Sequence, residues 1–215
     1  MESITPQIIL YIFGVPISST IISTWVTMLL ITAFVLVISK FSPDTLDMIG
    51  EFLTSMISGI MPEKNIEIYL PLLGTLAIFI AVSNSIGIIP ILSAPTSDIN
   101  TPIALSIVIF FSVHLFGIQK FGLIGYIKEL ATPIFLFPFE IIGQISRTVS
   151  LSLRLFGNIL SGELISAIIF GLIPLVAPLP FIGLSLFIGI LQAYVFTALS
   201  SVYIDAAVAA NNNLV

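Results

Sequence analysis

The sequence predicts an all-α integral membrane protein with about five membrane helices, one interfacial amphipathic helix, and a last pair of long, tilted helices that form a hairpin. Of its 215 residues, 58% are hydrophobic and 8% are charged, whereas soluble domains carry roughly 25% charged residues. Residues 3–39, 68–97 and 164–204 contain no Asp, Glu, Lys or Arg. About 20 apolar residues in a helix cross a bilayer, so each of these stretches can hold a span.

The first predicted span covers residues 19–39. The chain before it has no basic n-region, so we interpret this span as a retained helix rather than a cleaved signal peptide. A helix-start signal follows at Ser42 and Pro43. From there, residues 43–61 place apolar side chains on one helical face and acidic side chains elsewhere. This pattern is typical of a helix that lies at the membrane interface.

Four further spans complete a single membrane domain, residues 1–215, and we expect them at 68–89, 102–118, 133–172 and 181–209. A proline cluster separates the last two: Pro174, Pro178 and Pro180. At about 1.5 Å per residue, the helix 133–172 would be about 60 Å long, twice the hydrocarbon thickness. It must therefore lie strongly tilted or be broken, with Pro138 and Gly143 as candidate break points.

Basic residues predict the orientation of the chain. If the spans alternate, all four lysines fall in connections on one side: Lys40, Lys64, Lys120 and Lys128. The connections 1–18, 91–100 and 171–180 on the other side contain no lysine or arginine. The positive-inside bias then predicts that the N-terminus is outside and the C-terminus is cytoplasmic.

Four ionisable residues lie within the predicted helix 133–172: Glu140, Arg147, Arg154 and Glu163. Insertion scales put the cost of an arginine at a helix centre at about 2.5–3.5 kcal/mol, so such residues need a reason to be there. The first three are spaced by seven residues and share a helix face with Gln144 and Asn158. The fourth projects to roughly the opposite face.

The final helix carries a second sparse polar stripe, formed by Ser185, Gln192 and Tyr203. Two long helices joined by a short loop can pack antiparallel. We therefore predict that Gln192 lies near Arg154 or Asn158.

Arg154 is predicted to be buried, and it stays protonated at any accessible pH. The structural alternative is an ion pair with Glu140 or Glu163. However, Glu140 lies about four turns away, and Glu163 points elsewhere. An unpaired guanidinium is a fixed positive charge suited to a mobile negative partner, so we favour a functional role.

The other polar residues allow two interpretations each. Arg147 can extend to the interface, where Glu140 could neutralise it, or it can serve the ion pathway. His114 in the third span could relay protons or be a satisfied polar group in the bundle. Asp98 could line an ion entrance or form a turn.

Several functional classes are disfavoured. The chain has no cysteine, so disulfides and thiolate sites are impossible, and we expect neither a metal nor a cofactor. A net charge of −5 without a basic cluster argues against nucleic-acid binding. An intramembrane enzyme lacks support because no HExxH motif is present. A standalone membrane transporter or channel is the remaining alternative, although no inverted repeat is evident.

The segment SRTVSLSLRLFGN (146–158), followed by SGELI (161–165), resembles the signature of subunit a of the F-type rotary ATP synthases, bacterial type. Further family landmarks are matched by LQAYVF (191–196), PTSDIN (95–100) and YIKEL (126–130). The resemblance covers about residues 66–206.

The resemblance implies roles by position. Arg154 aligns with the essential stator arginine that faces the carboxylates of the rotating c-ring. Asn158 and Gln192 match polar residues near it, Glu163 an acid in one aqueous half-channel, and Glu140 an acid nearer the cytoplasm. Two departures stand out: family members often carry His or Glu at Ser185, and the short N-terminal region leaves little extramembrane structure before the first span.

The resemblance also implies partners and location. These are c-ring subunits, peripheral-stalk b subunits and the rest of the complex, in a bacterial inner membrane. Such a subunit is not an enzyme by itself, since the chain has no GxxxxGK[ST] phosphate-binding pattern. The transported ion would be H⁺ or Na⁺.

Overall fold

The computed structural model describes residues 8–12, 15–61, 66–87, 94–130, 135–172 and 178–209. Apart from one short hairpin, the regular secondary structure of these residues is helical. Four helices are long and apolar enough to cross a membrane: α1 (Ser19–Phe41), α4 (Asn100–Leu130), α5 (Phe137–Leu172) and α6 (Pro178–Ala209). With the shorter apolar helix α3 (Leu70–Ile86), they confirm the predicted all-α membrane fold.

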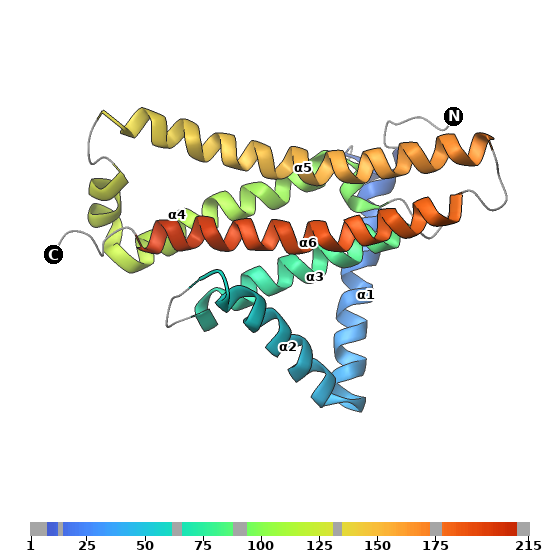
Figure 1. Cartoon of the computed structure of the whole chain (residues 1–215), viewed down its shortest axis with the longest axis horizontal. Helices are drawn as coiled ribbons and strands as arrows, with labels where there is room; N and C mark the ends of the chain where they lie inside the picture. The colour runs from blue at the N-terminus through green and yellow to red at the C-terminus, as the bar shows by residue number, and fades with distance from the viewer. Residues whose placement is uncertain are drawn as a thin grey trace.

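Helix α6 lies at the centre of the bundle, in contact with α3, α4 and α5. These four helices run roughly lengthwise beside one another, whereas α1 and α2 (Pro43–Ser58) project from them as a wedge (Figure 1). The predicted interfacial helix corresponds to α2. Its acidic side chains Asp44, Asp47 and Glu51 are exposed, and Ile57 on its apolar face is buried.

The bundle is held by two apolar clusters. In the first, Ile80, Ile109, Leu155 and Phe196 join α3, α4, α5 and α6. In the second, Ile57 and Leu73 pack with residues near the end of α6. Van der Waals packing and shape must supply most of the cohesion here, because lipid tails are as apolar as these side chains.

The third span is longer than the predicted 102–118 and contains a break. Helix α4 continues to Leu130 but is interrupted at Gly122, where φ is 72°. Only glycine adopts this conformation readily. Beyond the break, the ring of Tyr126 packs on Gly117, where a Cβ atom would lie 2.4 Å from the ring.

The last two helices form the predicted hairpin, lying side by side in Figure 1. The predicted break points were wrong: α5 is one helix through Gly143, and Pro138 lies in its first turn, where no backbone N–H is needed. For the same reason α6 begins at Pro178 rather than 181. Pro178 and Pro180 lie in the first turn of this helix, after α5 has ended at Leu172. Pro174 lies outside the described residues.

Other boundaries also differ from expectation. The second span begins at Leu70, after a 3₁₀ turn η1 (Ile66–Ile68). Before α1 lies an antiparallel hairpin that the sequence analysis did not predict, formed by β1 (Ile8–Ile12) and β2 (Val15–Ser18). A second 3₁₀ turn, η2 (Pro95–Ser97), precedes α4 and contacts α1, α3 and α5.

Candidate functional site

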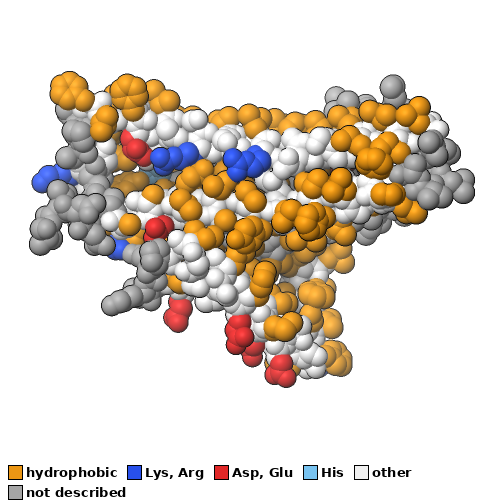
Figure 2. All heavy atoms as spheres, in the orientation of Figure 1, with side chains coloured by type: hydrophobic (Ala, Val, Ile, Leu, Met, Phe, Trp, Pro, Cys, Tyr) orange, Lys and Arg blue, Asp and Glu red, His pale blue; other side chains and the backbone are white. Residues whose placement is uncertain are grey.

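Arg154 lies midway along α5 and is exposed at the surface of the chain. The sequence analysis expects it to be buried in a membrane helix without a partner in its own chain, and the other helices of the chain do not cover it. Helix α5 turns Leu151 and Leu155 into the core, which directs the arginine outward. Figure 2 shows basic side chains on a face that is otherwise largely apolar. Among the described residues, no acid lies within ion-pair distance of Arg154.

Asn158, one turn after Arg154, binds α6 directly. Its side-chain Nδ2 donates a hydrogen bond of 2.6 Å to Oε1 of Gln192, which confirms the predicted proximity of Gln192 and Asn158. Gln192 is only 3% exposed, and within the described part of the chain its Nε2 has no hydrogen-bond partner. A pair of neutral amides therefore lies beside Arg154 and adds no negative charge.

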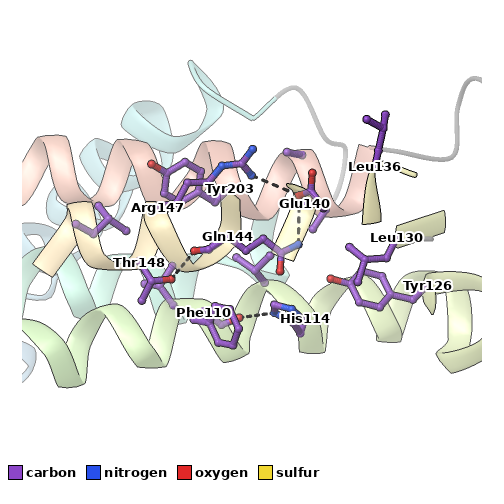
Figure 3. Close-up of a pocket in the computed structure, with 15 residues that line it drawn as sticks. Phe110, His114, Tyr126, Leu130, Leu136, Glu140, Gln144, Arg147, Thr148 and Tyr203 are labelled. Atoms are coloured by element: carbon purple, nitrogen blue, oxygen red, sulfur yellow. Dashed lines mark hydrogen bonds and ion pairs between the residues drawn. The ribbon is translucent and has the colours of Figure 1, made fainter. Parts of the chain in front are cut away.

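A cavity of about 370 Å³ opens between α4, α5 and α6. It brings together three residues that the sequence singled out, Glu140, Arg147 and His114 (Figure 3). Gln144 and Tyr203, from the predicted polar stripes, line it as well. The cavity thus joins polar groups from three helices toward the N-terminal end of α5.

Glu140 organises the α5 side of this cavity. Its Oε1 accepts a hydrogen bond of 3.3 Å from Gln144 and lies 3.9 Å from Nη1 of Arg147. The Arg147 guanidinium also lies 5.6 Å from the centre of the Tyr203 ring, within cation–π range. The contact between Glu140 and Arg147 is the pairing that the sequence analysis considered.

His114 faces the same cavity from α4 (Figure 3). Its Nδ1 lies 2.7 Å from the carbonyl oxygen of Phe110. A carbonyl only accepts hydrogen bonds, so Nδ1 is the donor of this bond. One ring nitrogen of His114, Nδ1, is thus hydrogen-bonded within α4. The interpretation of His114 as a satisfied polar group in the bundle expects such a bond.

A second polar cluster surrounds η2, toward the other end of α5. The carboxylate of Glu163 lies beside the Ser97 hydroxyl. Asp98 accepts a 2.8 Å hydrogen bond from Thr20 of α1 and a 3.0 Å bond from the backbone N–H of Asn100. The second bond confirms the turn-forming role considered for Asp98. The first joins α1 to this cluster.

Ser185 of α6 reaches the turn of α5 that carries Glu163. A Cβ atom on Gly162 would lie only 2.8 Å from the Ser185 hydroxyl oxygen, so the two helices touch here because residue 162 has no side chain. Ser185, where the sequence departs from the resembled family, thus places a small hydroxyl next to the turn of α5 that carries Glu163.

The sequence analysis missed several members of this second cluster. Ser97 lies inside the PTSDIN motif and could have been read from it. Thr20 gave no sequence signal, since its partner Asp98 is 78 residues away. Among the described residues, no group of His, Asp or Glu could hold a metal ion.

The family described as ATP synthase A chain matches residues 21–205. ATP synthase subunit a 2 of a Bradyrhizobium species is 40% identical, with 95% of each chain covered. ATP synthase subunit a of Moorella thermoacetica is 37% identical, with 95% of this chain and 97% of the relative covered. The Legionella pneumophila (Philadelphia 1) protein of the same name is 37% identical over 92% of this chain and 90% of its own.

Proposed function

Because the chain belongs to the ATP synthase A chain family, we propose that it is the stator that couples ion flow to rotation in a bacterial ATP synthase. As a member of this family it is a multi-pass, non-catalytic subunit of the membrane sector of that complex. In the proposed function it supplies two aqueous half-channels, and Arg154 separates them. Proton or sodium flow through the half-channels would then drive c-ring rotation and ATP synthesis.

The observation that carries this proposal is the position of an unpaired arginine between two polar clusters. Glu140 lies about 21 Å before Arg154 along the helix axis and Glu163 about 14 Å after it, at about 1.5 Å per residue. Neither acid pairs with the arginine. The exposed guanidinium is thus available to a charge on another subunit, whereas an internal ion pair would have occupied it.

The chemistry that follows is electrostatic. During synthesis, an ion enters beside Glu163, Ser97 and Asp98 and neutralises a ring carboxylate, which then rotates into lipid. When that carboxylate reaches Arg154, its ionised form gains about 4 kcal/mol at a separation of about 4 Å and an effective dielectric of about 20. This corresponds to a decrease of roughly three pKa units and forces the ion off.

The released ion leaves through the cavity at Glu140, Gln144 and His114. Arg154 prevents ions from passing directly between the clusters, because a mobile cation would have to approach a fixed positive charge. The gain at Arg154 exceeds the driving force of about 2.3 kcal/mol per charge per 100 mV. A potential of 100 mV alone therefore does not move the ionised carboxylate away from Arg154, and its neutralisation by the next incoming ion must contribute.

The amide pair of Asn158 and Gln192 supports Arg154 in the proposed function. Amides offer hydrogen bonds without charge, so they support the guanidinium and an arriving carboxylate without competing for either. Replacement of either residue by an acid would neutralise the arginine from within its own chain.

Orientation and partners complete the proposal. Lys40, Lys120 and Lys128 lie on the cytoplasmic side, so the N-terminus is outside and the C-terminus is inside the bacterial inner membrane. The polar cluster at η2 then opens outward and the Glu140 cavity opens inward. The c-ring faces Arg154, and peripheral-stalk b subunits hold the chain against rotation.

Reconstitution separates this function from a standalone transporter or channel. The purified chain alone should show no proton or sodium flux across liposomes. The complete complex should pump one of the two ions when ATP is added, and stimulation of its ATP hydrolysis by sodium would identify the ion. Substantial flux through the isolated chain would refute the stator function.

A further inference from the structure

A buried chain of hydrogen bonds links η2, α3 and α6 at a distance from Arg154. The Thr96 hydroxyl donates a 2.6 Å bond to Oδ1 of Asn84, and Nδ2 of Asn84 donates a 2.8 Å bond to the carbonyl oxygen of Gly189. Thr96 is 0% exposed and Asn84 is 6% exposed. Most buried polar groups are hydrogen-bonded, and Thr96 and Asn84 meet that condition through bonds that join η2, α3 and α6.

Gly189 is required by the same contact. A Cβ atom on Gly189 would lie 2.9 Å from Cβ of Asn84, closer than any real pair of such atoms. The Asn84 side chain can therefore reach the Gly189 carbonyl only because residue 189 has no side chain. Small residues allow membrane helices to approach in this way.

The hydrogen bonds between Thr96, Asn84 and Gly189 lie next to the polar residues of the proposed ion pathway. In η2, the residue after Thr96 is Ser97, which lies beside Glu163. On α6, Ser185 one turn before Gly189 packs on Gly162, and Gln192 one turn later binds Asn158. The same three bonded residues thus fix the segment that carries Ser97 and the helix that carries Ser185 and Gln192.

We propose that Asn84 is a positioning residue of the ion pathway. Through its bonds to Thr96 and Gly189 it holds both η2 and α6 on α3, and so sets Ser97 beside Glu163 and the polar face of α6 against α5. Asn84 touches neither Arg154 nor Glu163 in this role. It acts on the η2 cluster and on the α6 segment between Ser185 and Gln192 at once, because one side of its amide binds η2 and the other side binds α6. The inference rests on the proposed stator function.

The size of the effect follows from the bonds. Loss of one buried hydrogen bond changes an equilibrium by roughly three- to tenfold. Without the Thr96 bond, the arrangement of Ser97 at Glu163 should be populated less by about this factor. Ion pumping should fall accordingly, although Arg154, Glu163 and Asn158 are all unchanged.

The first test compares two substitutions at one buried position, Thr96→Val and Thr96→Ser. Valine keeps the branched shape and removes the hydroxyl, whereas serine keeps the hydroxyl. Inverted membrane vesicles that contain the complete complex are supplied with ATP, and acidification or radioactive sodium uptake is measured. The amount of the chain in the purified complex serves as the control for assembly.

We expect Thr96→Val to assemble normally and to lower pumping about three- to tenfold, and Thr96→Ser to retain pumping. Asn84→Leu should lower pumping at least as far as Thr96→Val, since it also removes the bond to Gly189. The double variant should lose no more pumping than Asn84→Leu alone, because Asn84→Leu already removes the bond between Thr96 and Asn84. Pumping of Thr96→Val at the wild-type rate, or equal loss in Thr96→Val and Thr96→Ser, would overturn the proposal.

A second measurement reports the geometry without relying on ion transport. The chain has no cysteine, and a Cβ atom on Gly162 would lie 3.4 Å from Cβ of Ser185, close to the 3.5–4.5 Å typical of disulfides. The pair Gly162→Cys and Ser185→Cys should oxidise readily, and more slowly when Asn84→Leu is added. An unchanged rate would refute the positioning of α6. If ion flux through the isolated chain disproved the stator function, this rate would still judge the role of Asn84.

Discussion

Replacement of Gln192 by leucine should separate the stability of the chain from its function. The residue is 3% exposed. Its Oε1 accepts the 2.6 Å bond from Asn158, but no described residue binds its Nε2. Loss of the bond costs about 0.5–1.5 kcal/mol, whereas removal of a buried unsatisfied group recovers about 1–3 kcal/mol. Gln192→Leu should therefore be neutral or stabilising to the chain.

Ion pumping by Gln192→Leu, in contrast to its stability, should decrease. Without Gln192, the Asn158 amide is no longer fixed beside Arg154, and ATP-driven pumping should fall about tenfold, which corresponds to roughly 1.4 kcal/mol. Thermal release of the chain from the detergent-solubilised complex measures stability, and acidification or sodium uptake by inverted vesicles measures pumping. Asn158→Leu is the matched variant, because it removes the donor of the same hydrogen bond instead of its acceptor. The double variant should lose no more pumping than Gln192→Leu alone.

Two outcomes would refute this reasoning about Gln192. Wild-type pumping in Gln192→Leu would show that the amide pair does not serve Arg154. A decrease of several degrees in the release temperature would show that the buried amide is satisfied and contributes to packing.

Two other substitutions follow from the same geometry. Glu140→Gln should change stability by less than about 1 kcal/mol, because its pair with Arg147 is half exposed. Ion release, measured as the rate of ATP synthesis, should nevertheless fall severalfold. An unaltered rate of synthesis would exclude Glu140 from the exit path. Gly189→Ala should reduce the amount of chain in the complex, since its Cβ would lie 2.9 Å from that of Asn84. Gly183→Ala, where nothing lies within 4 Å, is its control in immunoblots of the purified complex, and equal amounts in both would contradict the packing described.

The membrane fold could be predicted because its signals are local. Long uncharged stretches and the amphipathic pattern of α2 depend only on neighbouring residues. Local signals also placed Gln192 near Asn158, since polar stripes on two helices of a hairpin can meet in few ways. The break at Gly122 and the start of α6 at Pro178 were missed, because glycine and proline are compatible with several backbone conformations until packing selects one.

The long-range contacts could not be predicted for a different reason. Helix α6 carries only a sparse polar stripe on an otherwise apolar surface, so its sequence does not show which face meets α3 and which meets lipid. Asn84 binds residues that are 12 and 105 positions away, and no periodic pattern connects them. The same ambiguity applies to Arg154: its charge was evident from the sequence, but the side of α5 that faces the core was not.

In the proposed function, Arg154 forces ions off a carboxylate of another subunit. The most direct test of this role is ATP-driven ion uptake by inverted vesicles that contain the complete complex with Arg154→Ala, compared with Arg147→Ala, which removes the paired arginine two turns away. We predict no measurable uptake for Arg154→Ala, with the chain present in normal amount, and partial uptake for Arg147→Ala. Pumping by Arg154→Ala at the wild-type rate would contradict the account.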